Sequence, residues 1–413
     1  MISIRFVLAL AVAALSTACS TAPAPAAAVS PPTLVLVSID GLRADMLDRG
    51  ATPNLQQLAR EGVHAEGMRP SYPSLTFPNH YTIVTGLRPD RHGIVHNSMW
   101  EDGLGMFRLG DRDAVTDARW WGGEPLWVSA EKAGLPTATW SWPGSEAPIQ
   151  GVRPRQWRIY DESVSLPDRV AQVLGWLQQP GSERPRLVTL YMEHVDKAGH
   201  DHGPDSAEYR AALEVVDSAI GLLLDGLRDR QLLDRVDLVV VSDHGMAAVP
   251  DGHAVITEDM VPPTVARVVS AGQSVGFTPL PGQEEAAERH LLGEHEHYAC
   301  WRREQLPGRW HYGSHPRIPA IVCQMEEGWA AMPAAYRPRL KPGTRGAHGY
   351  DPALPSMQAV FVAKGPSFRE RTTLPVFDNV DVYPLLTRLL GLSVPPNDGN
   401  PQTLLPALRQ STP

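Results

Sequence analysis

Four short apolar runs along the chain have the pattern of strands that are buried on both faces of a sheet. The first, TLVLVSI at 33–39, is continuous and rich in β-branched residues. Runs of the same design occupy 186–191, 237–242 and 358–363. The first three runs lead to aspartates, which are Asp40, Asp196 and Asp243.

Between these runs lie segments with the period of a helix. Residues 206–228 place apolar side chains three to four positions apart, and residues 380–390 do the same. Strands that alternate with helices predict an α/β fold, with a doubly wound, mostly parallel sheet flanked by helices. Ligands of such sheets bind beyond the carboxyl ends of the strands, so we expect the three aspartates at a binding site.

The alternation stops between about 250 and 345. This stretch has Gly/Pro-rich turns, an acidic segment at 284–296, and Cys300 and Cys323. We expect a smaller α+β insertion packed beside the sheet. In an oxidising compartment an even pair of cysteines favours one disulfide, with two buried free thiols as the alternative.

The first 32 residues have the pattern of an export signal. Arg5 precedes an apolar run at 6–15, and small residues follow up to Cys19. We expect a signal peptide at 1–18 and an Ala/Pro-rich tether at 19–32, with a C-terminal tail at 401–413. The residues before Cys19 resemble a bacterial lipoprotein box, except that Leu15 lies four positions before the cysteine instead of three. A lipid-anchored protein of the cell envelope and a free periplasmic protein both remain open.

Composition narrows the classes of ligand. The 413 residues include 37 Lys and Arg against 46 Asp and Glu, a net charge of −9. This balance argues against a broad basic surface for duplex nucleic acid. A small anionic substrate stays open, because bound metal cations can attract it locally. No pattern indicates an obligate protein partner.

Acidic and imidazole side chains cluster after the strand runs. Asp196 and His200 are four residues apart, and Asp243 and His244 are adjacent. One turn of chain can aim each pair at one point, and mixtures of Asp and His suit zinc. A lone Asp-His-Gly turn is more often structural. Pieces of this kind after three buried strands, however, suggest a centre with two metal ions.

Thr76 opens a segment, TFPNHYTIVTG at 76–86, that reads as a helix with Pro78 in its first turn. On the structural interpretation Thr76 is the N-cap of that helix. On the functional interpretation the same hydroxyl, close to a metal ion, is a nucleophile. The segment alone favours the cap.

Taken together, these motifs resemble the nucleotide pyrophosphatase/phosphodiesterase family, in its bacterial form, within the alkaline phosphatase superfamily. The resemblance runs from Thr33 to Asn400 and rests on IDG at 39–41, TFPNHYTIVTG at 76–86, DKAGH at 196–200, SDHGM at 242–246 and HGYD at 348–351. It implies an alkaline-phosphatase-like catalytic domain over 33–400 with two zinc ions per chain. One zinc would be held by Asp196, His200 and His348, and the other by Asp40, Asp243, His244 and the Thr76 oxygen. Asn97 would donate a hydrogen bond to the phosphate, and Phe77 and Tyr191 would flank the leaving group or the base.

The implied activity is hydrolysis of nucleoside phosphodiesters and pyrophosphates to nucleoside 5′-monophosphates through a phosphothreonine intermediate. Alternatives within the superfamily are a lipid- or choline-directed phosphodiesterase and a phosphomonoesterase. A sulfatase needs Cys or Ser at the position of Thr76. A non-catalytic metal-binding lipoprotein is the alternative from another class.

Overall fold

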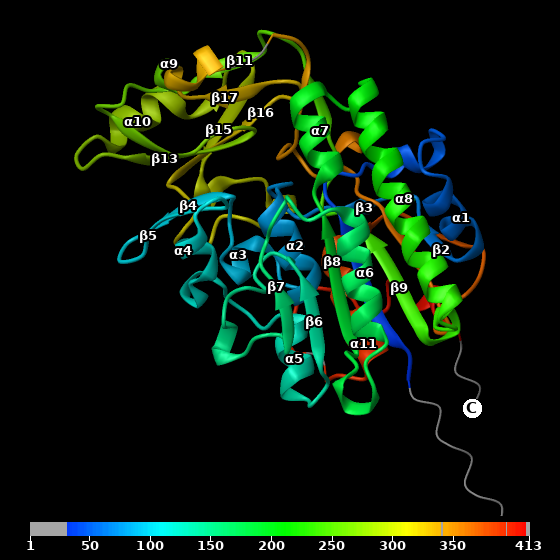
Figure 1. Cartoon of the computed structure of the whole chain (residues 1–413). Coiled ribbons are helices and arrows are strands. Elements are labelled where there is room, and N and C mark those ends of the chain that lie inside the picture. Colours follow the sequence, from blue (N-terminus) through cyan, green and yellow to red (C-terminus); the bar gives the residue numbers. More distant parts are fainter. Residues whose placement is uncertain (1–30, 340–341, 394, 410–413) are drawn as a thin grey trace, which may run out of the picture. The chain divides into compact units, whose positions relative to one another are not determined.

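The computed structural model describes residues 31–339, 342–393 and 395–409, so the predicted signal peptide and Cys19 lie outside the described residues. A mixed sheet runs through the centre of this part of the chain (Figure 1). Its eight strands, in spatial order, are β20 (Thr372–Leu374), β2 (Val63–Ala65), β19 (Phe361–Lys364), β9 (Val236–Val241), β1 (Thr33–Ile39), β8 (Leu187–Met192), β6 (Thr137–Trp140) and β7 (Gln156–Arg158).

The four predicted runs all form strands of this sheet, but one of them runs in the opposite direction. β1 pairs in parallel with β8 and β9, and β6 pairs in parallel with β7 and β8. β19 pairs antiparallel with β9 and β2. The chain reaches β19 directly after the insertion, which begins beyond the carboxyl end of β9. It therefore enters the sheet at the carboxyl ends of β1 and β9, and β19 runs in the opposite direction to them. A run buried on both faces has the same composition in either direction, and the sequence therefore could not show this reversal.

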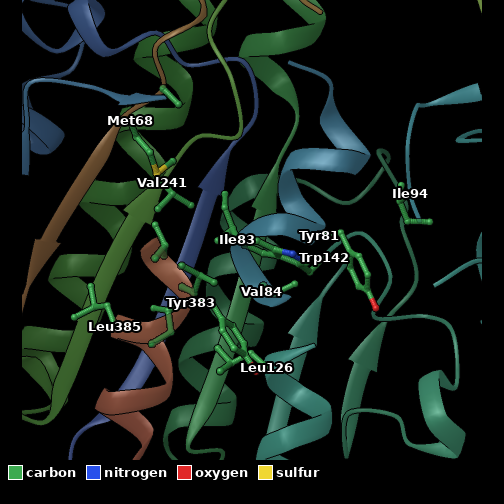
Figure 2. Close-up of a cluster of buried hydrophobic side chains, with 14 of the residues drawn as sticks. Met68, Tyr81, Ile83, Val84, Ile94, Leu126, Trp142, Val241, Tyr383 and Leu385 are labelled. Carbon is green, nitrogen blue, oxygen red and sulfur yellow. The ribbon is translucent and has the colours of Figure 1, made fainter. Parts of the chain in front are cut away.

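Alternate residues of β1 face two separate cores, as a doubly wound sheet requires. Leu34 and Leu36 belong to a core with α2 (Thr76–Thr85), α5 (Leu126–Lys132) and α11 (Val382–Leu390). Figure 2 shows part of this core, which includes Tyr383 and Leu385 of α11, Val241 of β9 and Ile83 of α2. Val35 and Val37 face the other core, which contains residues of α1 (Pro53–Glu61), α6 (Leu166–Leu177) and α8 (Ala207–Asp229).

α8 matches the helix expected at 206–228 within a residue at each end. Ser206 caps it, because its hydroxyl accepts a hydrogen bond from the Tyr209 N–H at 3.0 Å. The buried face contains Val216, Ile220 and Leu223, whereas Val215 is 52% exposed. Among the described residues, none of the helices combines the length and the apolar character needed to cross a membrane.

The region between β10 (Ala247–Val249) and β18 (Arg345–Ala347) forms a second, smaller α+β unit above one end of the central sheet in Figure 1. β10 and β18 pair antiparallel. Cys300 and Cys323 face each other on neighbouring strands and form a disulfide. The sheet of this smaller unit has the strands, in spatial order, β12 (Ala266–Ser270), β13 (Ser274–Pro279), β16 (Ile321–Met325), β15 (Tyr298–Arg302) and β14 (Gly293–Glu294). The unit also contains α9 (Thr257–Met260), α10 (Glu284–Leu291), and the parallel pair β11 (Ala254–Ile256) and β17 (Ala330–Met332).

The remaining helices and strands are short. They are β3 (Met68–Arg69), α3 (Pro89–His92), β4 (Ser98–Glu101), β5 (Gly105–Arg108), α4 (Arg112–Thr116), α7 (His194–His202) and β21 (Phe377–Asp378).

Candidate metal centre

The carboxyl ends of β1, β8 and β9 bring three aspartates together. The parallel register of β1 and β9 places Asp40 beside Asp243, two residues beyond the last paired positions. Asp196 lies in the first turn of α7, which follows β8. Gly41 allows this approach, because a Cβ there would lie 3.0 Å from the Cα of Asp196 and the φ of Gly41 is +70°.

Three histidines direct one ring nitrogen each toward these carboxylates. The Nδ1 atoms of His200, His244 and His348 lie 2.9–3.0 Å from the backbone carbonyls of Gly346, Gly245 and Ser74. A carbonyl only accepts, so each Nδ1 carries a proton, and neutral His200 and His348 each keep a lone pair on Nε2. The Nε2 atoms of His200 and His348 are 3.0 Å apart. Two facing lone pairs at that distance require a cation or a proton between them.

The electrostatics of the site disfavour a proton as that bridge. Burial lowers the pKa of His348 well below its ordinary value, and the neighbouring His244 and His200 lower it further. Burial raises the pKa of Asp40 well above its usual range, with added repulsion from Asp243 and Asp196. Burial also opposes ionisation of Asp243, but His244 and His80 outweigh it and hold the pKa of Asp243 well below the usual range.

Each of the three carboxylates also has one buried oxygen without a hydrogen-bond partner in the described part of the chain. These atoms are Oδ1 of Asp40, Oδ1 of Asp196 and Oδ2 of Asp243. Buried polar atoms are normally satisfied, so three such atoms in one place need a common explanation. Carboxylate oxygens and imidazole nitrogens are the donors that zinc prefers outside thiolate sites, and the residues therefore fit a metal centre.

Possible ligand atoms from three side chains each come close together in two groups. One contains Asp196, His244 and His348, and the other contains Asp40, His80 and Asp243. The sequence-based expectation placed His244 with Asp40 and Asp243 instead. The geometry explains the difference, because the His244 ring stacks on His348 at 3.5 Å while its Nε2 lies 2.9 Å from Asp243 Oδ2. His244 thus stands between the two groups.

His80 is a residue of the site that the sequence analysis did not single out. Its Nδ1 donates to the Thr76 carbonyl at 2.9 Å and its Nε2 lies 2.7 Å from Ser38 Oγ. Both ring nitrogens are therefore engaged, and the ring stands 3.2 Å from Asp243 Oδ2 as a support for that carboxylate. The signal available in the sequence was its place four residues after Thr76, on the same helix face.

Thr76 does not cap α2. The N-cap position belongs to Leu75, whose side chain makes no capping hydrogen bond. Thr76 is instead the first helical residue, and its Oγ1 lies 3.3 Å from His244 Nε2. The structural interpretation of Thr76 as a cap, which the segment alone favoured, is therefore wrong, and the hydroxyl lies beside the cluster of carboxylates and imidazoles.

Asn97 and Phe77 lie next to Thr76 and share a hydrogen bond. The Phe77 N–H donates to Asn97 Oδ1 at 3.0 Å. This bond orients the amide so that its NH₂ group remains as a donor. The Phe77 ring packs against Phe107 and Trp121, with ring centroids 5.9 Å away in both cases.

A cavity of about 440 Å³ opens onto these residues. Tyr191 lines it but is only 8% exposed, and its hydroxyl donates to Asp40 Oδ2 at 2.6 Å. Tyr160 lines the same cavity and is 39% exposed. Tyr160 was missed in the sequence because it lies in an irregular segment with no motif around it. The cavity is lined by Asp40, Thr76, Phe77, Asn97, Leu109, Arg112, Val115, Ser141, Pro143, Gly144, Glu146, Tyr160, Glu162, Tyr191, Glu193, Asp196, Lys197, His200, Asp201 and His348.

Comparison with known proteins identifies relatives over most of the chain. A bovine (Bos taurus) protein, ectonucleotide pyrophosphatase/phosphodiesterase family member 3, is 36% identical over 92% of this chain and 45% of its own length. An uncharacterized pyrophosphatase/phosphodiesterase of Schizosaccharomyces pombe is 35% identical over 91% of this chain and 80% of its own length. The venom phosphodiesterase of Crotalus durissus collilineatus is 36% identical over 92% of this chain and 48% of its own length. The chain thus spans about half the length of the bovine and venom proteins.

A solved structure agrees with these sequence relatives. Murine ectonucleotide pyrophosphatase/phosphodiesterase 5 superposes with a TM-score of 0.86 at 31% identity, over 92% of this chain and 100% of the murine chain. That structure is of an inactive variant, in which an alanine replaces a threonine, in complex with AMP. The similarity confirms the expected alkaline-phosphatase-like α/β fold. The family model for type I phosphodiesterase / nucleotide pyrophosphatase matches residues 34–351, and the chain belongs to this family.

Proposed function

We propose that this protein is a two-zinc phosphodiesterase that hydrolyses nucleoside phosphodiesters and pyrophosphates to nucleoside 5′-monophosphates. The observation that carries the proposal is the Thr76 hydroxyl, which caps no helix and lies 3.3 Å from His244 Nε2 among three carboxylates. The AMP bound to the murine relative, and the loss of activity when a threonine of that relative becomes alanine, support both the substrate class and a threonine nucleophile.

In this proposal the ligands of the two zinc ions are residues of the cluster described above. When bound, zinc would neutralise the phosphate and lower the pKa of the threonine hydroxyl. Three carboxylates and a deprotonated Thr76 balance the four positive charges of two such ions. The first ion would be held by Asp196, His200 and His348, and the second by Asp40, Asp243, His244 and Thr76 Oγ1.

The side chains of the protein then act on the phosphoryl group. Thr76 Oγ1 attacks phosphorus in line with the leaving oxygen, the bond from phosphorus to that oxygen breaks, and the leaving group departs with it. This leaves a phosphothreonine ester that still carries the nucleoside. The Asn97 NH₂ group donates to a non-bridging oxygen. Water then attacks the same phosphorus, which releases the nucleoside 5′-monophosphate and restores the threonine.

The nucleoside side of the substrate is assigned to aromatic side chains in the cavity. Phe77 and Tyr160 both line it, and base-to-aromatic stacking is worth ~1 to 3 kcal/mol. Tyr191 is less suited to stacking, because it is buried and its hydroxyl is bound to Asp40. We therefore assign Tyr160, instead of Tyr191, as the second aromatic side chain that stacks on the base together with Phe77.

A phosphodiester should be strongly preferred over a phosphate monoester. The two cationic side chains lining the cavity, Arg112 and Lys197, are paired with Glu146 and Glu162. The second negative charge of a monoester thus meets no unpaired Arg or Lys side chain among these lining residues, while the base of a nucleoside diester gains a stacking surface. We expect kcat/KM for a nucleoside 5′-aryl phosphodiester to exceed that for the aryl phosphate by at least about tenfold, the lower part of the range that stacking provides.

The alternative activities are tested when a choline phosphodiester is measured alongside these two substrates. Higher kcat/KM for the aryl phosphate would favour a phosphomonoesterase, and higher kcat/KM for a choline phosphodiester would favour the lipid-directed activity. Either result would contradict the proposed substrate class. Absence of turnover with every phosphodiester would favour the non-catalytic metal-binding protein.

The Tyr191 hydroxyl should act on metal binding. Tyr191→Phe removes the 2.6 Å hydrogen bond to Asp40 Oδ2. Loss of a partner that orients a ligand usually weakens metal affinity by ~10- to 100-fold. We therefore expect zinc affinity, measured by titration of the apo-protein, to fall within that range. Tyr312→Phe is the matched control, since its buried hydroxyl donates to the Val95 carbonyl outside the site. Equal zinc affinity in the two variants would contradict a supporting role of Tyr191.

For localisation we propose export to the periplasm or cell envelope of a bacterium, directed by residues 1–18 and with residues 19–32 as a tether. The ectonucleotide and venom names of the relatives support an exported protein. Lipid attachment at Cys19 and free release are the two forms of this proposal. We propose a small nucleotide or phosphodiester as the ligand, and neither duplex nucleic acid nor an obligate protein partner.

A further inference from the structure

The segment from Ile159 to Val164, which carries Tyr160, is an irregular stretch held largely by side chains of other segments. The Tyr160 N–H donates to Glu146 Oε1 at 3.0 Å, and Ser141 Oγ donates to the Ile159 carbonyl at 3.1 Å. Farther along the segment, Arg169 of α6 donates to the carbonyls of Asp161 and Val164 at 3.3 and 2.9 Å. These polar contacts decide where the segment runs.

Glu146 is the member of this set that acts directly on Tyr160. It is 4% exposed and lines the same cavity as the ring. Its second oxygen, Oε2, accepts a hydrogen bond from Arg112, a cavity residue at the start of α4. A buried carboxylate is stable only when its charge is paired and its oxygens are bonded. Glu146 therefore ties two walls of the cavity together.

The Tyr160 ring has little else to hold it. It is 39% exposed, and its aromatic neighbour is Tyr191, at 6.2 Å between centroids and 60° between planes. The position of the Tyr160 ring therefore depends mainly on the position of the Tyr160 backbone, which is fixed by the hydrogen bond from its N–H to Glu146.

We propose that Glu146 is a positioning residue that sets the place of the Tyr160 ring in the cavity, and through it the selectivity for substrates that carry a base. This inference rests on the proposed phosphodiesterase function. The hydrogen bonds of Glu146 go to Arg112 and to the Tyr160 N–H, and its effect should therefore appear in substrate selectivity.

Glu131 of α5 provides a matched control, because its carboxylate bonds to the backbone at the other end of the edge strand β7. Its Oε1 accepts the N–H groups of Thr137 and Arg155 at 2.7 and 3.0 Å, and its side chain is 11% exposed. Arg155 immediately precedes β7, whereas Tyr160 follows β7 by two residues. Glu131 is thus embedded like Glu146 and holds the other end of the strand, but it does not line the cavity.

The test is the ratio of kcat/KM for a nucleoside 5′-aryl phosphodiester to that for methyl aryl phosphodiester, which has no base. We expect Glu146→Ala to lower this ratio about tenfold, within the range that base stacking provides. Glu146→Gln keeps an acceptor for the Tyr160 N–H and should retain most of the ratio. Glu131→Ala should keep the ratio of the wild type even where it lowers the melting temperature.

A double-mutant cycle distinguishes action through Tyr160 from any other effect. In a Tyr160→Ala background, Glu146→Ala should lower the ratio no further, because the group that it positions is gone. Additive effects of the two substitutions would overturn the proposal, as would an unchanged ratio in an active Glu146→Ala protein. If the wild type itself turned over neither diester, the proposed function would fail together with this inference. If the wild type turned over both with equal efficiency, the base-selective role of the cavity would fail while the diester chemistry stood.

Discussion

Replacement of Thr76 by alanine is expected to lower phosphodiester turnover by at least about 10³-fold, since removal of a covalent nucleophile typically costs that much or more. Zinc binding should persist, because the six Asp and His side chains of the centre remain. Stability should also persist, because Thr76 makes no capping bond whose loss would cost ~1 kcal/mol. The measurements are kcat with a nucleoside aryl phosphodiester, zinc content and the melting temperature.

Two further variants sharpen this test. Thr76→Ser should keep partial activity and allow a phosphorylated seryl intermediate to be trapped and detected by mass spectrometry. Thr85→Ala removes a threonine hydroxyl from the other end of the same helix, where it donates to the Tyr81 carbonyl at 2.7 Å. That variant should keep wild-type kcat. Undiminished turnover in Thr76→Ala would rule out a threonine nucleophile.

Removal of metal is expected to abolish turnover, and about two zinc ions per chain should restore it. The reason is the set of three buried carboxylate oxygens without partners and the two Nε2 atoms 3.0 Å apart, which only a cation satisfies together. The experiment is dialysis against a chelator, followed by zinc titration with activity and metal content measured in parallel. Full activity with one ion or none would contradict a two-metal centre.

Single ligand variants should separate the two ions. Asp196→Ala and Asp243→Ala remove carboxylates from different groups, so each should lose about one ion and most of the activity. Asp237→Asn is the control, because this carboxylate lies on β9 at the end far from the site and is bonded to Ser367. It should bind zinc like the wild type. Loss of both ions in each ligand variant would indicate one cooperative centre.

The main features of the sheet were readable in the sequence because burial on both faces leaves an unbroken apolar run. All four runs formed strands of the central sheet, and Asp40 follows β1 directly, while Asp243 follows β9 after one intervening residue. The order of the strands and the reversed direction of β19 could not be predicted, because a run that is apolar throughout has the same composition whichever strand it pairs with and in whichever direction.

The orientation of individual side chains was the least predictable part of the site. Thr76 had the residue type and the neighbours of an N-cap, but the helix begins one position earlier than that reading requires. Tyr191 and Tyr160 are the same residue type, and only the fold decides that one hydroxyl meets Asp40 while the other ring faces the cavity. Local patterns encode the period of an element, whereas contacts across elements depend on packing.

By itself, the sequence determined the type of each main element and the residue types that could bind a metal, because periodicity and ligand chemistry are local properties. The tertiary structure alone decided which of these residues meet. His348 lies 148 residues after His200, yet the β10–β18 pair and its contact with α7 bring their Nε2 atoms within 3.0 Å. Gly346 makes this contact possible, since a Cβ there would lie 2.5 Å from the Gly199 carbonyl oxygen. Such a meeting depends on the close packing of segments distant in the chain, which no local pattern records.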